Sequence, residues 1–215
     1  MTRPTEGDIA KHFDDGVDCC APRRDASKRP GFALVKLLRR QLADVGLAGR
    51  SVLELGCGRG ELSLDLIHDG AASVTGIDLS PDAIEYARRT AAEDGLSERA
   101  DFRAGNAATT SLPSRDVVVH HRVICCYHDV DAFLAASIGA AGSIYAFSMP
   151  RSRGIWGIGV RVALKLENLT HSIKRRGFRA FVHDERVVHS ALSRAGFHLK
   201  SRSDRGGWFA AVYVS

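Results

Sequence analysis

The sequence contains no run of about eighteen or more apolar residues, the length at which a helix can cross a membrane, so no membrane span is expected. The segment from Met1 to Lys11 is polar and lacks the apolar core of a signal peptide, so secretion is not expected either. The five cysteines are an odd number, and four of them are sequence neighbours, at 19–20 and 125–126. Because neighbouring cysteines rarely bridge each other, we expect no disulfide framework and a reducing, cytoplasmic location.

Acidic residues are fewer than basic ones: 25 Asp and Glu against 30 Lys and Arg give a net charge of +5. A basic protein can attract nucleic acid, acidic small molecules or a membrane surface. The positive charge is not concentrated along the chain as a whole. A general richness in arginine is therefore the favoured explanation of the basic net charge. No RNA-binding module or aromatic-basic platform is present, so nucleic acid is not the favoured partner.

Internal repeats are absent too, and strand and helix signals alternate along the chain. Strands are expected at 51–55, 73–77, 100–103, 116–119, 143–147, 197–201 and 208–214. Helices are expected at 8–13, 31–45, 61–68, 81–91, 130–138 and 184–195. The last two strands are joined by a turn-rich link and should form an antiparallel hairpin. The alternation predicts an α/β fold with a doubly wound, mostly parallel sheet and helices on both faces.

The length of 215 residues fits one domain, which we divide into four parts. Residues 1–49 are expected to form an N-terminal lid and helix, and residues 50–148 the cofactor-binding core. Residues 149–182 are an insertion expected to cover the carboxyl ends of the strands, and residues 183–215 hold the last helix and the hairpin. The sequence does not indicate the oligomeric state.

A glycine-rich turn follows the first strand, in the segment Leu53-Glu54-Leu55-Gly56-Cys57-Gly58-Arg59-Gly60. A strand that leads into a glycine turn and then a helix lets a ligand lie close to bare backbone. Asp78 stands at the end of the next strand, where its carboxylate can accept hydrogen bonds from both hydroxyls of a ribose. The two features together predict an adenosine-containing ligand.

The spacing of the glycines favours S-adenosylmethionine (SAM) over NAD. A dinucleotide fold has a third glycine where this chain has Glu61, and a carboxylate there would repel a pyrophosphate at the helix N-terminus. SAM has no phosphate and carries an ammonium and a sulfonium group, so it tolerates acidic neighbours. Glu54, below the turn, can help to hold SAM through water or the loop backbone.

The turn and the segments after it resemble the motifs of the class I SAM-dependent methyltransferases, whose fold has a seven-strand, Rossmann-like sheet. The glycine turn resembles their first motif, Gly76-Ile77-Asp78-Leu79-Ser80-Pro81 the second, and Gly105-Asn106-Ala107 the third, where Asp is more usual. The end of the central strand, 116–129, resembles the fourth motif. The resemblance covers about residues 50–148 and implies that the final strand lies antiparallel inside the sheet.

The resemblance also implies which residues bind SAM and its product, S-adenosylhomocysteine (SAH). Gly56, Gly58 and Gly60 would line the methionine part, together with their neighbour Cys57. Asp78 would hold the ribose and Leu79 would pack on the adenine. Asn106 would accept a hydrogen bond from the adenine amino group, beside Ala107.

The cluster that follows the fourth strand is unusual for this family. It places His120 and His121 at the carboxyl end of a strand, where doubly wound folds hold their chemistry, with Tyr127 and His128 just beyond. A histidine could remove a proton from the acceptor, and Tyr127 could orient it. Neighbouring residues in an extended strand point to opposite sides, so only one of His120 and His121 should face the methyl group. We favour His121 and also count it among the residues that contact SAM. A zinc site is the less favoured alternative because the ligand spacing matches no standard site, so no metal is assigned.

The insertion contains an apolar stripe at helical spacing, from Ile155 through Ile158, Val162, Leu166 and Leu169 to Ile173. Basic residues are frequent between 151 and 179, and Glu167 is the only acid there. The favoured interpretation is a cover helix whose stripe packs on the sheet edge. The alternatives are recognition of an anionic or amphipathic acceptor, with walls from Trp156, Phe178 and Phe181, or contact with a membrane surface.

The sequence therefore predicts an enzyme that transfers a methyl group from SAM to a small-molecule acceptor. O-methylation is favoured because histidines, and no Asn-Pro-Pro-Tyr motif, follow the fourth strand. The outline also resembles the magnesium-protoporphyrin O-methyltransferases, although no residue assigns that substrate. A nucleic-acid or protein methyltransferase, and a SAM-binding protein without catalysis, are the alternatives.

Overall fold

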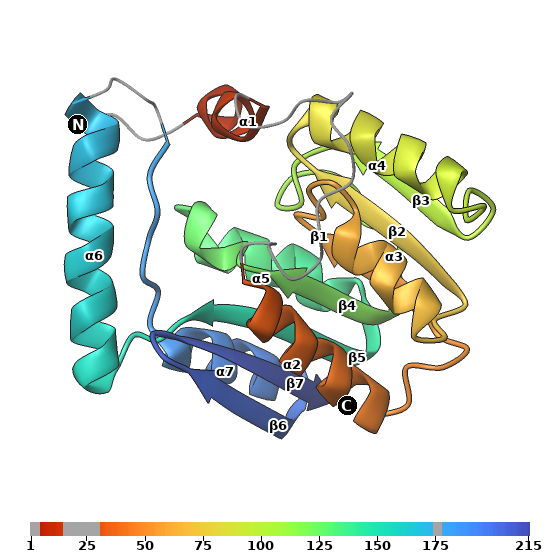
Figure 1. The fold of residues 1–215 in the computed structure, drawn as a ribbon. Helices are drawn as coiled ribbons and strands as arrows, with labels where there is room; N and C mark the ends of the chain where they lie inside the picture. The colour runs from red at the N-terminus through yellow and green to blue at the C-terminus, as the bar shows by residue number, and fades with distance from the viewer. Residues whose placement is uncertain (1–4, 15–30, 174–177) are drawn as a thin grey trace.

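The computed structural model describes residues 5–14, 31–173 and 178–215. Its centre is a seven-stranded sheet in the order β3-β2-β1-β4-β5-β7-β6 (Figure 1). The strands are β1 (Ser51–Leu55), β2 (Ser73–Asp78), β3 (Ala100–Ala104), β4 (Arg115–His121), β5 (Ala141–Pro150), β6 (His198–Arg205) and β7 (Trp208–Val214). The helices are α1 (Glu6–Asp14), α2 (Phe32–Asp44), α3 (Glu61–His68), α4 (Pro81–Glu93), α5 (Val130–Gly139), α6 (Gly154–Ile173) and α7 (Glu185–Arg194), with a short 3₁₀ turn η2 (Ile124–Cys126). The predicted fold class is confirmed.

The central strands are apolar on both faces, as parallel strands covered by helices must be. Val117, Val118 and Val119 of β4 are fully buried, and β4 pairs in parallel with β1 on one side and β5 on the other. One sheet face packs against the leucines of α2 and α3, and the other packs against α5 and α7. The carboxyl ends of β1, β2 and β4 consequently meet at one edge of the sheet, where the candidate site lies.

The C-terminal hairpin enters the sheet instead of extending it. Strand β7 lies between β5 and β6 and runs antiparallel to both, as the family resemblance implied. The run from Phe209 to Val212 is buried on both faces, which suits an interior strand, whereas β6 is mostly exposed and forms the sheet edge.

The apolar stripe of α6 does not pack on the sheet edge, so that expectation was wrong. The packed face of α6 carries Gly157, Leu164 and Asn168, on the side opposite the stripe. A Cβ at position 157 would lie 2.5 Å from the carbonyl carbon of Ser152, so the close approach requires glycine there. The stripe instead faces outward along its described length. Among the described residues, no helix combines the length and the apolar character needed to cross a membrane.

Candidate active site

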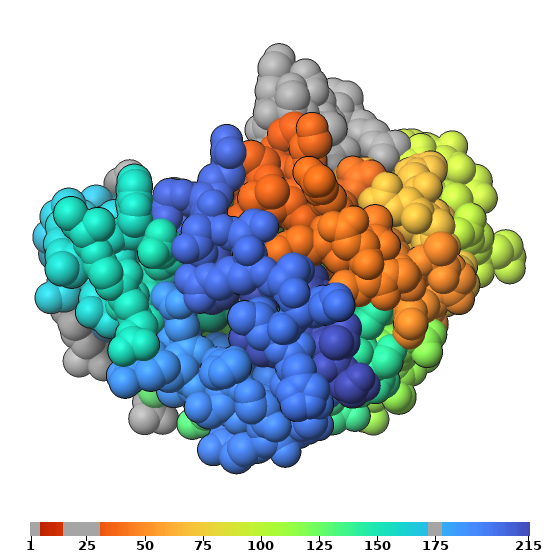
Figure 2. Space-filling view, turned by 90° about the horizontal axis from the view of Figure 1, so that it is seen from below, coloured from red at the N-terminus to blue at the C-terminus, as the bar shows by residue number. Residues whose placement is uncertain are grey.

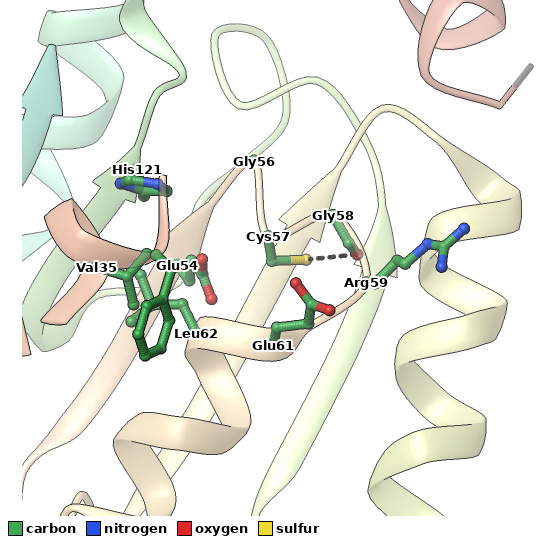
Figure 3. Close-up of a pocket in the computed structure, with 10 residues that line it drawn as sticks. Val35, Glu54, Gly56, Cys57, Gly58, Arg59, Glu61, Leu62 and His121 are labelled. Atoms are coloured by element: carbon green, nitrogen blue, oxygen red, sulfur yellow. Dashed lines mark hydrogen bonds between the residues drawn. The ribbon is translucent and has the colours of Figure 1, made fainter. Parts of the chain in front are cut away.

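Residues from four strand ends line one cavity of about 590 Å³. The glycine turn follows β1, Asp78 ends β2, Gly105 and Ala107 follow β3, and His121 ends β4. Most of the far wall comes from outside the sheet, from Ile9, His12 and Phe13 of α1, Leu164 and Glu167 of α6, Phe178 and Ala180, and Trp208 at the start of β7 completes it. A smaller cavity of about 160 Å³ lies under the glycine turn and includes Glu54 and His121 (Figure 3). The larger cavity therefore joins the predicted cofactor motif to a compartment covered by α1, α6 and Phe178.

The three glycines of the turn serve different purposes. All have a left-handed backbone, with φ of 66° at Gly56, 51° at Gly58 and 74° at Gly60. A Cβ at Gly56 would lie 2.4 Å from Val123, and one at Gly60 would lie 2.7 Å from Phe102, whereas the space beside Gly58 is open. Gly56 and Gly60 are thus needed for packing, and Gly58 leaves bare backbone at the cavity.

This difference predicts two unequal effects on stability. Gly56→Ala should lower the free energy of unfolding by at least about 2 kcal/mol, because it adds a clash to an unfavourable backbone conformation. Gly58→Ala should cost only about 1 kcal/mol, from the backbone conformation alone. Urea unfolding of the two variants measures both, and equal losses would contradict this assignment of the glycines.

The carboxylate of Asp78 is held in place by backbone N–H groups. Its Oδ2 accepts a hydrogen bond from the Gly58 nitrogen at 2.7 Å, and its Oδ1 accepts one from the Ser80 nitrogen at 2.9 Å. Burial raises the pKa of Asp78, although these two hydrogen bonds oppose that shift. Asp78 and the neighbouring Leu79 both line the larger cavity. The carboxylate is therefore tied to the glycine turn and exposed to the same space.

Glu54 is a buried carboxyl group on the floor of the smaller cavity. Its side chain is nearly inaccessible, and its Oε2 accepts a hydrogen bond of 2.5 Å from the hydroxyl of Ser63. Burial raises the pKa of Glu54 to about 8, and the nearby negative charge of Asp78 adds to the shift. A cation that entered the cavity would favour the ionised carboxylate. Figure 3 shows Glu54 beside the glycine turn, on the same side as His121.

The two neighbouring histidines point to opposite sides of β4. His120 is fully buried in the core, where its ring stacks on Phe147 and its Nε2 lies 3.1 Å from the hydroxyl of Tyr145. Burial lowers the pKa of His120 to about 3. His120 lines neither cavity, so its candidacy as a catalytic residue is corrected: it faces the α5 and α7 side of the sheet. His121 lines both cavities.

The hydrogen bonds of His121 define its tautomer. The hydroxyl of the buried Ser148 lies 3.1 Å from the Arg122 nitrogen and 2.7 Å from His121 Nδ1. The Arg122 N–H can only donate, so the hydroxyl accepts there. We assign the hydroxyl's own proton to the bond with Nδ1, because the hydroxyl has no other acceptor among the described residues. The neutral ring then carries its proton on Nε2, which is buried and has no hydrogen-bond partner among the described residues. Burial lowers the pKa of His121 to about 4, so the ring is neutral at pH 7.

Arg122 is a cavity residue that the sequence analysis did not single out. Among the described residues it is the only non-glycine with a left-handed backbone, with φ of 61°. Its guanidinium group lies 5.0 Å from the ring centre of Trp208, and both residues line the larger cavity. Strained backbone of this kind is often found at functional sites, and here it places a cation directly after His121.

Two other candidates from the fourth-strand cluster have different surroundings. Tyr127 lines the larger cavity, its ring packs 4.7 Å from that of Phe133, and burial raises the pKa of its phenol. His128 is exposed and packs edge-on against Phe181, and it lines neither cavity. The prediction that His128 could act as the base is therefore wrong, because the turn after η2 directs this side chain to the outer surface.

Asn106 is also placed differently from the expectation. Its Oδ1 accepts a hydrogen bond from the Ala108 nitrogen at 2.9 Å, and its Nδ2 donates to Glu6 of α1 at 2.5 Å. The oxygen expected to meet adenine is thus used locally, while the neighbouring Gly105 and Ala107 line the cavity. Cys57 lies at the smaller cavity with its buried thiol 3.8 Å from the carbonyl oxygen of Gly58.

The cover of the larger cavity is built from α1, α6 and the segment that begins at Phe178. The ring of His12 stacks on Phe178 at 4.2 Å and meets His171 of α6 at 5.0 Å. Asn168 of α6 makes two hydrogen bonds with the backbone of Ala180, of 2.8 and 2.9 Å. Of the three expected apolar walls, Phe178 lines the cavity, whereas Trp156 is exposed and Phe181 lies outside it.

Residues 52–138 match the family model described as the methyltransferase domain. This part of the chain is similar to the methyltransferase domain. Among solved structures, magnesium protoporphyrin IX methyltransferase from Synechocystis PCC 6803, with bound SAH, has a TM-score of 0.74 at 21% identity, covering 98% of both chains. Geranyl diphosphate C-methyltransferase from Streptomyces coelicolor A3(2) has a TM-score of 0.68 at 14% identity, covering 99% of this chain and 98% of that one. The expected Rossmann-like fold of the class I methyltransferases is confirmed.

Curated relatives of the methyltransferase domain include ribosomal protein L11 methyltransferases. The protein from Edwardsiella ictaluri (strain 93-146) is 30% identical over 63% of this chain and 42% of its own length. That from Aliivibrio salmonicida (strain LFI1238) is 29% identical over 52% of this chain and 38% of its own length. The chain therefore spans about two-fifths of the length of these relatives.

Proposed function

We propose that this protein is a SAM-dependent methyltransferase that acts on a small-molecule carboxylate. The observation that supports this most directly is the single cavity that runs from the glycine turn and Asp78 to His121 and Arg122 under a cover of helices. One end carries the family's cofactor motif, and the other end offers a hydrogen-bond donor and a cation to an acceptor.

The cofactor end fits SAM better than a dinucleotide. Gly58 leaves open space at the turn, and Asp78 faces that space with a fixed carboxylate. Glu54 and Glu61 line the smaller cavity, where carboxylates attract the ammonium of a methionine and repel a pyrophosphate. The similar magnesium protoporphyrin IX methyltransferase was solved with SAH and with SAM bound. When bound, SAM supplies an activated methyl group for direct displacement from sulfur.

The acceptor end does not require a general base if the acceptor is a carboxylate. Transfer of a methyl group to a carboxylate oxygen forms the O–C bond as the S–C bond breaks, and no proton has to leave the acceptor. His121 Nε2–H would donate a hydrogen bond to the acceptor, and Arg122 would balance its charge. The role of His121 would then be to hold the acceptor oxygen in line with the methyl group, and positioning of this kind can contribute greatly to the rate. Tyr127 lines the same compartment and would limit the orientations of the acceptor.

A protein acceptor is the second candidate, because the L11 methyltransferases are among the relatives. Turnover assays that detect SAH separate the two candidates. The panel should contain aliphatic and polycyclic carboxylic acids, the matching alcohols and amines, and purified ribosomal protein L11. We expect turnover with carboxylic acids and none with L11. Methylation of L11, with no carboxylic acid accepted, would overturn the proposal, and SAM binding without any turnover would favour a non-catalytic role.

Asp78→Ala tests the cofactor end. Loss of a charge-assisted hydrogen bond to ribose should weaken SAM binding by about 1–3 kcal/mol. Isothermal titration calorimetry with SAM, SAH and NAD measures this, with Asp82→Ala on the first turn of α4 as a control outside the cavity. An unchanged SAM affinity would remove Asp78 from the site, and NAD binding tighter than SAM would overturn the choice of cofactor.

A further inference from the structure

Helix α6 presents an apolar stripe to the outside of the molecule. Nine large apolar side chains are exposed among the described residues, and six of them are on this helix. They are exposed by between 53% and 82% and are Ile155, Trp156, Ile158, Val162, Leu166 and Leu169. Exposed apolar residues scattered singly are ordinary, but a contiguous row along one helix marks an interaction surface. Five of the six, all except Trp156, follow one face of the helix at helical spacing, and we call this row the α6 stripe.

The α6 stripe has a basic flank. Arg161 and Lys165, both exposed, are one helical turn apart and lie next to Ile158, Val162 and Leu169 by helical position. The opposite flank carries Glu167, which pairs with His171 at 3.8 Å. In the sequence, the helix is followed directly by Lys174-Arg175-Arg176. An apolar stripe beside basic residues complements a bilayer with anionic headgroups.

The opposite face of the same helix belongs to the candidate active site. Leu164 and Glu167 line the larger cavity, and Asn168 ties the helix to the cavity wall at Ala180. Figure 1 shows α6 standing at one side of the molecule, beyond the sheet, and Figure 2 shows it forming one flank of the surface. A surface that the stripe contacts would thus lie one helix diameter from the acceptor compartment.

We infer that the α6 stripe docks the protein on the surface of a membrane that contains anionic lipids. The helix would lie along the interface, with the apolar side chains between the lipid chains and with Arg161 and Lys165 among the headgroups. This goes beyond the proposed function, since docking requires neither SAM nor an acceptor. It also gives an amphipathic acceptor a short path from the bilayer to the cavity.

A second copy of the chain is a less suitable partner for the same surface. A two-fold axis that pairs the stripes antiparallel would bring the flank of Arg161 and Lys165 against the same flank of the other copy. Like charges placed opposite each other disfavour that pairing. The anionic headgroups of a bilayer impose no such repulsion.

Flotation with vesicles tests the inference, with the whole chain and no SAM present. The vesicles are pure phosphatidylcholine or contain about one-third phosphatidylglycerol. We expect at least about tenfold more protein bound to the anionic vesicles, and a marked loss at high salt, because salt screens the basic flank. Val162→Ser combined with Leu166→Ser should reduce binding about tenfold or more, and Arg161→Gln with Lys165→Gln should remove the preference for anionic vesicles.

Leu199→Ser is the matched control, because Leu199 is also an exposed leucine but lies on the edge strand β6. It should bind vesicles like the unaltered protein, and all variants should keep their SAM affinity. Absence of binding to either vesicle, or equal binding by the stripe variant, would overturn the inference. It would also be overturned if light scattering showed a dimer that the Val162→Ser, Leu166→Ser variant dissociates, since a second copy would then cover the stripe.

Discussion

His121→Ala should lower kcat by about 10²–10³ with a carboxylate acceptor, the usual effect of removing one positioned hydrogen-bond donor. Among the described residues, His121 is the only histidine that lines both cavities, and its Nε2–H has no hydrogen-bond partner there. SAM affinity should change little, because the glycine turn, Asp78 and Glu54 are untouched. Steady-state kinetics at saturating SAM, with SAM binding measured in parallel, separates the two effects.

The control for this substitution is His120→Phe, one residue away on the other side of the strand. It removes a buried imidazole that stacks on Phe147 and leaves the hydroxyl of Tyr145 its bond to Ser137. The variant should keep nearly full turnover. Loss of turnover in His120→Phe with retention in His121→Ala would contradict the assignment.

The pH profile tests whether His121 changes its protonation state in the working range. Because the pKa of His121 is lowered to about 4, the ring is neutral throughout pH 6 to 9, and kcat should be flat in that range. A general base with the ordinary pKa of about 6.5 would lose activity as the pH falls through that value. A fall of this kind in the unaltered protein, absent from the residual activity of His121→Ala, would show that His121 is a base.

The sequence predicted most helices and strands well, because the residues that start, fill and end them lie within a few positions of one another. The glycine turn, the run of valines in β4 and the Ser80 cap of α4, whose hydroxyl accepts from the Ala83 nitrogen at 3.0 Å, all act within a few residues. The family resemblance added the position of β7 between β5 and β6. The residues alone predicted the hairpin of β6 and β7. They did not indicate which of these two strands pairs with β5.

Contacts between distant segments explain what the sequence did not reveal. Asn106 donates a hydrogen bond to Glu6, which is 100 residues away in the sequence. No local pattern near Asn106 could predict this contact. The stripe of α6 was visible as a periodicity, but periodicity does not state whether the apolar side is packed, and here the cavity is covered by the other side. The contact of Ser148 with His121 could have been predicted from the sequence. The two residues are register partners in the pair β4–β5, so a prediction of the strand register would have placed them side by side.

SAM should bind with release of a proton, and its apparent affinity should rise by roughly 50-fold between pH 6 and pH 8. Burial raises the pKa of Glu54 to about 8, so in the free protein the carboxyl group is mostly protonated at pH 7. The ammonium of SAM in the smaller cavity would favour the carboxylate, and the proton would leave as the ligand enters. Calorimetry at pH 7 in two buffers with different ionisation enthalpies counts the protons, and we expect close to one per SAM.

Glu54→Gln isolates this effect, because the amide keeps the size of the side chain and cannot ionise. The variant should bind SAM more weakly at pH 8 and should lose the pH dependence and the proton release.

The same substitution should also remove a destabilising contribution in the free protein. A carboxyl group whose pKa is higher when folded than when unfolded makes the fold less stable as the pH rises from about 4.3 to 8. Urea unfolding of the free protein at pH 6 and pH 8 should therefore show a fall in stability that is smaller in Glu54→Gln. If the variant kept the same proton release on binding SAM, the titrating group would be another residue, and Glu54 would have no part in holding the ammonium.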